Sequence, residues 1–375
     1  MKQFFLMLFT IALIFLFFPV AHAQEVPPIM QDTFMKAKVL EVVKEASIDV
    51  FGTAGFMQEV RVNIKNGEEK GTEQIVEYQI EDKQVQPMLS VGDNVVIGKQ
   101  SGHGEDVYYI SDIYRLNALW VMIGLLALFA IFFAKKSGAR SFLGLALSFL
   151  VIAFVIIPLI LRGISPLWAS LLGGIIISLF ATYVAHGFHA RTTIALLGML
   201  GTLLFAVITS LIFVKLAHLT GLGSEDAFYL RYAPIDGLDL RGLLLGGIII
   251  GVLGVLDDVA TAQAAAVEEI KRANSKLGFS ELYKRGLSVG REHIVSLVNT
   301  LVLAYTGASF PLLLLFVIYP KPWWVTLNSE LVMEELVRML VGSIALIVAV
   351  PLTTFLAAQY FQERARVSDS SGHVH

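Results

Sequence analysis

Residues 117–134 read NALWVMIGLLALFAIFFA, a run without a single charge. A helix of this length rises roughly 27 Å, close to the ~30 Å thickness of a bilayer's hydrocarbon core. Hydrophobic residues make up 56% of the 375 positions and charged residues only 16%. A water-soluble globule of this size does not show that balance. The run is therefore predicted to cross a membrane, and lipid is the expected solvent for most of the chain.

Further apolar stretches follow this run, and each is long enough to cross a bilayer as a helix. They cover residues 141–161, 166–185, 192–214, 240–257, 294–318 and 336–358. Together with the first run they predict an all-α polytopic membrane domain of about seven transmembrane helices over residues 117–360. A tail at residues 361–375 completes the chain.

Residues 24–116 differ from the rest because they are polar, with sixteen acidic and nine basic side chains. Apolar and polar residues alternate in short runs that are separated by turn residues such as Asn66-Gly67, a pattern typical of β-strands. Strands are expected at residues 36–43, 59–64, 74–80, 95–97 and 107–110. Their number and spacing predict a small all-β barrel, either OB-like or SH3-like.

Residues 1–23 have the features of a secretory signal peptide. Lys2 supplies a positive start, residues 4–18 are apolar, and Ala21-His22-Ala23 offers small residues at a cleavage site. Cleavage there would begin the mature chain at Gln24. The alternative is an uncleaved anchor, although its apolar core is short for a span. Either way, the β domain is expected to be extracytoplasmic.

The distribution of basic residues predicts the same orientation. With the β domain outside, the inner loops and tail carry twelve Lys or Arg, and the outer loops and helix ends carry six. That bias follows the positive-inside rule. Trp168, Trp323 and Trp324 then fall at outer edges, where aromatic belts occur. We therefore expect a multi-pass protein of the cell (cytoplasmic) membrane with its C-terminus in the cytoplasm.

The composition also excludes several classes of function. The chain has no cysteine, which rules out disulfides, thiolate nucleophiles, a lipoprotein anchor and cysteine-bound zinc or iron–sulfur sites. Its net charge is -3 and its basic residues are scattered, which disfavours nucleic acid as a partner. No Gly-rich phosphate loop or nucleophile elbow occurs. No cofactor is expected.

The span at 240–257 is glycine-rich and ends in the pair Asp257-Asp258. Its glycines, predicted to let another helix approach closely, are Gly242, Gly246, Gly247, Gly251 and Gly254. A helix that starts at Gly242 places Asp257 about 22 Å along its axis, in the inner third of the hydrocarbon core. A carboxylate at that depth needs a cation or a hydrogen-bond donor. Alternatively, the helix shifts outward and the pair marks the lipid–water boundary.

The next helix begins on the same side of the membrane with Arg291-Glu292-His293, and Arg291 is the expected counter-ion of Asp257. Its residues at intervals of three and four form a polar stripe on one face: Glu292, Ser296, Asn299, Leu303 and Thr306. Such a stripe faces protein or water, not lipid. Interhelical hydrogen bonding and a solute path explain it equally well. Whether metal binds here stays open.

These same segments resemble a known family. Residues 254–259 (GVLDDV), 290–294 (GREHI), 298–301 (VNTL) and 304–308 (AYTGA), with Gln263-Ala264 between them, are similar to the signature of the YibE/F-like family of bacterial membrane proteins. The resemblance covers residues 117–360, and the exported domain ahead of them also resembles that family's arrangement. It implies a multi-pass protein of a bacterial inner membrane. It implies no particular reaction or substrate.

Three functions fit these features. The first is an ion- or proton-coupled transporter whose site comprises Asp257, Asp258, Arg291, Glu292, His293 and Asn299. The second is a membrane-anchored scaffold or sensor in which the β domain binds an extracytoplasmic protein partner. The third is a metal-dependent intramembrane enzyme, although the motif at residues 257–261 (DDVAT) lacks a third acid and no second Asp-rich motif occurs. The expected partners are the bilayer and a small ion or solute, and the sequence favours an activity other than catalysis.

Overall fold

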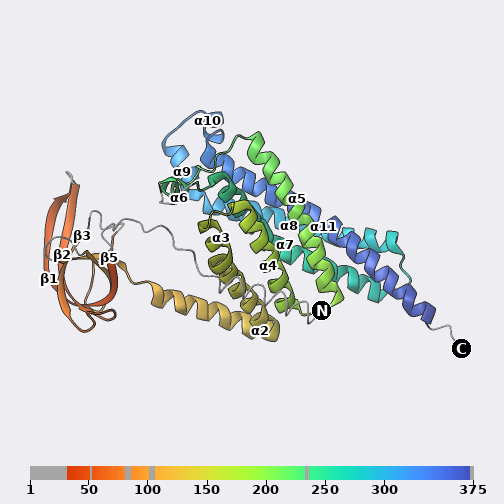
Figure 1. The fold of residues 1–375 in the computed structure, drawn as a ribbon, viewed down its shortest axis with the longest axis horizontal. Helices are drawn as coiled ribbons and strands as arrows, with labels where there is room; N and C mark the ends of the chain where they lie inside the picture. The colour runs from red at the N-terminus through yellow and green to blue at the C-terminus, as the bar shows by residue number, and fades with distance from the viewer. Residues whose placement is uncertain are drawn as a thin grey trace. The chain divides into compact units, whose positions relative to one another are not determined.

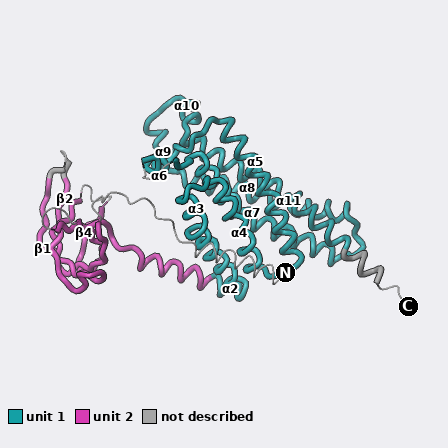
Figure 2. Tube along the Cα trace, viewed as in Figure 1, with its two compact units in different colours: residues 1–23, 130–375 teal, residues 24–129 magenta. Residues whose placement is uncertain are grey.

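The structure is a computed structural model that describes residues 32–50, 53–80, 86–100, 106–232, 235 and 237–371. The predicted signal peptide at residues 1–23 lies outside the described residues. The chain divides into two compact units, residues 24–129 and residues 130–375 together with 1–23 (Figure 2). The first unit contains a β-barrel and the start of a long helix, and the second is a helical bundle.

The β-barrel is closed and has the strand order β1-β2-β3-β5-β4. Its strands are β1 (Thr33–Val50), β2 (Thr53–Ile64), β3 (Glu73–Ile80), β4 (Asn94–Gln100) and β5 (Val107–Ile113). Strand β1 pairs with both β2 and β4, while β3 and β5 pair in parallel. The barrel that the sequence predicted is thus present. Each predicted strand lies within an observed one, although β1 and β2 are longer than predicted.

Alternation explains which side chains fill the barrel, because successive residues of a strand point to opposite faces. Met35, Ala37 and Val39 are buried, whereas Lys38 and Leu40 between and after them are exposed. Register shifts occur in β1 between Val39 and Glu41 and again a few residues later. Such β-bulges bend a strand, and here they let β1 serve two neighbours.

The described residues from Leu116 onward are mostly helical (Figure 1). Its elements in order are α2 (Leu116–Val151), the π-helical turn η1 (Ile152–Ile156), α3 (Ile157–Leu161), α4 (Pro166–His186), α5 (Ala190–Leu216), α6 (Glu225–Arg231), α7 (Leu240–Ala273), α8 (Phe279–Ala308), α9 (Phe310–Ile318), α10 (Trp323–Leu327) and α11 (Glu330–Ser371). Helix α11 therefore continues into the tail that was expected after residue 360.

Within the described residues, five helices are long and apolar enough to cross a membrane, or six if the bent pair α8–α9 counts as one span. The spans predicted at 117–134 and 141–161 belong to one stretch of 46 residues, Leu116–Leu161. A break interrupts that stretch at Lys135, whose φ of 50° and ψ of -128° are not helical. The seven-helix count depends on whether this break separates two spans.

Helix α7 lies at the centre of the bundle and packs against α4, α5, α8 and α11 (Figure 1). Close approach depends on small residues where the helices meet. A Cβ atom at Gly246 would strike Ser170 of α4, and one at Gly198 of α5 would strike Thr353 of α11. Some buried hydroxyls donate to carbonyls of their own helices, as Thr202 does to Gly198 at 2.8 Å. Others, such as the hydroxyl of Thr353, are buried without a hydrogen-bond partner among the described residues.

Candidate functional site

One face of α7 borders three cavities that follow one another along the helix. The residues of this face recur at intervals of three and four and so align: Leu240, Leu243, Gly247, Ile250, Gly254, Asp257 and Thr261. The first four line a cavity of about 310 Å³. Ile250, Gly254 and Asp257 line a second of about 390 Å³, and Thr261 lines a third of about 260 Å³. We call them the first, middle and third cavities.

The middle cavity contains Asp257. This side chain is half-buried, and its Oδ1 atom accepts a hydrogen bond of 3.0 Å from Oγ1 of the fully buried Thr182 on α4. Hydroxyl groups of α2 and α4 also line the cavity: Ser141, Ser148 and Ser178. The remaining lining is mostly apolar. A small number of polar groups in an apolar cavity is typical of a ligand site.

The first cavity is lined by two charged groups, Glu334 and Arg338 of α11. Glu334 is buried and accepts a hydrogen bond of 2.9 Å from the amide of Gly223. One turn earlier, Glu330 accepts from Oγ1 of Thr220 at 2.7 Å and from the amide of Gly221 at 3.0 Å. The two glutamates thereby hold the loop before α6 against α11, at the edge of this cavity.

The first and middle cavities share two lining residues, Ile152 and Ile250. Ile152 is the first residue of the π-helical turn η1, which interrupts the helical stretch between α2 and α3. Single π-turns inside helices occur frequently at functional sites, because the extra residue changes the direction in which side chains point. The two isoleucines therefore border both the cavity that holds Asp257 and the one that holds Glu334 and Arg338.

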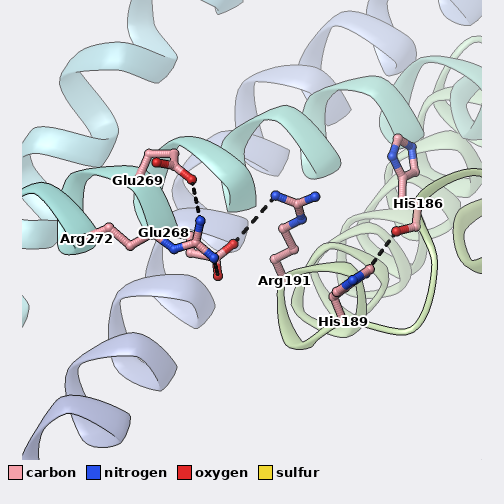
Figure 3. A network of polar contacts seen from close by, with 6 residues as sticks. All are labelled: His186, His189, Arg191, Glu268, Glu269 and Arg272. Atoms are coloured by element: carbon pink, nitrogen blue, oxygen red, sulfur yellow. Dashed lines mark hydrogen bonds and ion pairs between the residues drawn. The ribbon is translucent and has the colours of Figure 1, made fainter. Parts of the chain in front are cut away.

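The third cavity lies at the other end of this face and is lined by His186, Arg191 and Thr192 together with Thr261. Arg191 extends toward Glu268, at 3.8 Å, and Arg272 contacts both Glu268 and Glu269 at 2.9 Å (Figure 3). His189 Nδ1 lies 3.1 Å from the carbonyl oxygen of His186 (Figure 3). In the part of the chain that the structure describes, no three His, Asp or Glu side chains cluster as metal ligands would.

The structure separates the residues that the sequence grouped into one site. Asp258 is exposed, and Arg291, Glu292, His293 and Asn299 are exposed on the outer face of α8. The expected ion pair between Asp257 and Arg291 does not occur among the described residues, and Asp257 instead accepts a hydrogen bond from Thr182.

The rotation of α7 explains this separation. Its side toward α8 carries Gln263, which lies about 120° around the helix from Asp257. Gln263 is buried, and its Nε2 donates to the Gly286 carbonyl at 2.8 Å and to Thr354 Oγ1 at 2.7 Å. This amide therefore joins α7, α8 and α11 on a side of α7 that Asp257 does not face.

The glycines of α7 differ in their surroundings. A side chain added at Gly242 would clash with Asp239, and one added at Gly246 with Ser170, and both glycines also lie close to Pro166 at the start of α4. Gly247 and Gly251 face the ends of Arg338 and Tyr305, while a Cβ at Gly254 would meet nothing within 4 Å. The glycines that were predicted to allow close helix packing therefore do so at the start of α7, whereas Gly254 borders the open space of the middle cavity.

Sequence reasoning missed Thr182, Gln263, Glu334 and Arg338. A signal was present, since Arg338 is a charge within the predicted span 336–358 and Thr182 is a hydroxyl within 166–185. Ionisable residues at membrane depth are functional candidates by default. Their grouping with Asp257, however, depends on which helix faces are turned toward each other.

A family model described as YibE/F-like protein matches residues 122–363. No curated protein and no solved structure matches the chain.

Proposed function

Because the chain belongs to the YibE/F-like protein family and its several apolar helices indicate a multi-pass membrane protein, we propose that it transports a small ion or solute, coupled to an ion or proton. The observation that carries this proposal is the series of cavities along α7. From Leu240 to Thr261 this face rises about 32 Å, which matches the ~30 Å hydrocarbon core. A solute that follows this face would cross the bilayer beside one helix.

Asp257 is the proposed binding group of this path. Its carboxylate projects into a mostly apolar cavity, where it attracts a cation or takes up a proton. Thr182 donates to Oδ1 and so holds the carboxylate in place, leaving Oδ2 for the solute. Asp258, exposed at the next position, adds negative charge near the third cavity and raises the local concentration of cations.

Ile152 and Ile250 form the proposed barrier of the path. A transporter must keep its site from opening to both sides at once, and an apolar constriction can do so by excluding water. The π-helical turn that begins at Ile152 gives this barrier a segment whose hydrogen bonding can change register. Glu334 and Arg338 form the polar end of the path beyond the barrier.

We also propose the orientation and the number of spans. A continuous helix of the 46 residues Leu116–Leu161 would be about 69 Å long, more than twice the hydrocarbon thickness. The break at Lys135 therefore divides it into two spans, which gives seven in total. The positive-inside rule then places the β domain outside a bacterial inner membrane, after a cleaved signal peptide, and the C-terminus in the cytoplasm.

Flux measurements test the proposal. Purified protein in proteoliposomes is given a panel of cations and a proton gradient, and wild type is compared with Asp257→Asn and Asp258→Asn, alone and combined. We expect Asp257→Asn to lose about tenfold or more of the flux, since interactions with a charged group in a low-dielectric site are strong. Asp258→Asn should keep most of it. Glu281→Gln, at an exposed acid on α8, is the matched control.

Unchanged flux in a folded Asp257→Asn variant would contradict the role of Asp257 as the binding group. No flux in wild type with any cation or gradient would contradict transport itself. That outcome favours the second candidate, a scaffold or sensor that acts through its barrel. The strand order β1-β2-β3-β5-β4 is the support for an OB-like barrel, a fold that often binds a ligand on its open face. A scaffold of this kind should tolerate both Asp variants.

A further inference from the structure

We propose that the protein forms a two-fold symmetric homodimer through the outer face of α8. This face carries a heptad seam, since six residues alternate at intervals of four and three: Ser288, Glu292, Val295, Asn299, Val302 and Thr306. All are exposed except Val302, which is half-buried. Seams of this spacing are what two helices use to pack side by side in a left-handed pair.

The seam lies opposite the face by which α8 joins its own bundle. Gly286, Gly290 and Leu301 are buried there, and Ile294 and Leu297 pack against the bundle core. A Cβ at Gly290 would strike Val350 of α11, so this inner contact is close. The seam is therefore a second packing surface of α8, and no described element of its own bundle covers it.

The polar side chains of the seam require a partner at membrane depth. From Glu292 to Thr306 the helix rises about 21 Å, most of a ~30 Å hydrocarbon core. Thr306 is satisfied within its own helix, because its hydroxyl donates to the Val302 carbonyl at 2.8 Å. Glu292 and Asn299 have no hydrogen bond or ion pair with any other described side chain. Left toward lipid, the amide of Asn299 would be costly, while the carboxylate of Glu292 lies at the membrane edge, just before the predicted span 294–318.

A second copy supplies what these groups need. A two-fold axis along the membrane normal brings identical residues to the same depth, with each surface facing itself. Asn299 can then pair with Asn299 of the other copy, because an amide both donates and accepts. Arg291 of each copy, exposed beside the seam, comes next to Glu292 of the other and offsets the repulsion between the two Glu292 carboxylates across the axis. A single polar residue in a seam is also the usual device that fixes register and number of helices.

Disulfide trapping tests the dimer directly because the chain has no cysteine. Asn299→Cys places one thiol on the axis, where two Cβ atoms approach closely enough to be bridged. After oxidation in native membranes we expect most of this variant to run as a covalent dimer. Leu204→Cys on α5, which is 59% exposed, is the matched control and should stay monomeric. If the oxidised Asn299→Cys variant runs entirely as a monomer, the proposal is overturned.

Charge exchange gives a second readout that does not depend on disulfide geometry. Glu292→Arg sets like charges against each other, so the dimer fraction in detergent, measured by light scattering, should fall about tenfold. The double variant Arg291→Glu, Glu292→Arg restores opposite charges across the axis and should recover the dimer. Failure of that recovery would contradict the pairing.

Disulfide trapping would also detect a different segment of the same chain packed on the seam. An intramolecular disulfide between Asn299→Cys and Leu126→Cys would assign the seam to the first part of α2 and would overturn the dimer. None of these outcomes depends on transport, since each is measured without flux.

Discussion

Asp257 and Asp258 are neighbours in sequence, yet a helix points their side chains about 100° apart. Asp257 is half-buried and bonded to Thr182, while Asp258 is exposed. The sequence marks the pair as unusual but does not distinguish its members. That distinction depends on the rotation of α7 about its axis, which is set by packing against four other helices.

Gln263 gives a prediction at this scale. Its buried amide bonds to Gly286 and Thr354, and a buried hydrogen bond contributes about 0.5–1.5 kcal/mol, with more lost when its partner stays unpaired. We expect Gln263→Leu to lower stability by about 1–3 kcal/mol, seen as a lower midpoint of thermal unfolding in detergent. In the double variant with Thr354→Val the two losses should be less than additive. Full additivity would show that the pair does not interact.

Lys99 gives a pH-dependent prediction in the barrel. Its ammonium lies between Asp106 and Glu69, and hydrogen bonds to those carboxylates raise the pKa of Lys99. The hydrogen bond from Lys99 in turn lowers the pKa of Glu69 below its usual 4.5. A lowered acid pKa means that the stability is present above pH 4.5 and is lost as the pH falls through the folded value.

The corresponding experiment is hydrogen exchange of β3–β5 peptides in the full chain. At neutral pH, Lys99→Met should exchange about two- to fivefold faster than wild type, as expected for a partly exposed ion pair. The ratio of the variant's exchange rate to that of wild type should approach one as acid protonates Glu69. It should also approach one at very alkaline pH, because Lys99 itself then loses its proton. A ratio that stays constant from neutral to acidic pH would be inconsistent with this pairing.

At the scale of elements, the sequence predicted most helices and all of the strands at about their observed places. Alternation and long apolar runs follow directly from burial. The strand at Val60 to Ile64 and the helix after Asn117 could therefore be predicted from their own residues. The long end of β1 was not expected. Residues after Lys44 have no clear alternation. They form a strand because they pair with the start of β2, from Glu59 back to Thr53, and such pairing between two segments cannot be predicted from either segment alone.

The break at Lys135 leads to a prediction about the number of membrane spans. If it separates two spans, Leu116 and Ile164 lie on one side of the membrane and Ser137 on the other. Single cysteines at these three positions, treated with a membrane-impermeant thiol reagent on intact and on opened cells, should show that pattern. Labelling of Ser137→Cys from the same side as Leu116→Cys would reduce the count to six.

At the scale of the whole molecule, the series of cavities is a tertiary property. Ile152 follows α2, Thr182 belongs to α4, and Glu334 belongs to α11, yet all lie near one face of α7. Composition and periodicity identify the helices but do not state which faces meet. The sequence therefore led to Asp257 as a candidate, and it paired that residue with the wrong neighbour on α8.

On the proposed function, one face of α7 lines an aqueous path. In this cysteine-free chain, single cysteines at Gly247, Gly254 and Thr261 lie on the lining face, while Val252 and Val259 on the packed faces serve as controls. We expect the lining positions to react with a membrane-impermeant thiol reagent at least about tenfold faster than the controls, with Gly247→Cys reached from the side opposite to Gly254→Cys and Thr261→Cys. Lining positions as unreactive as Val252→Cys would contradict the path.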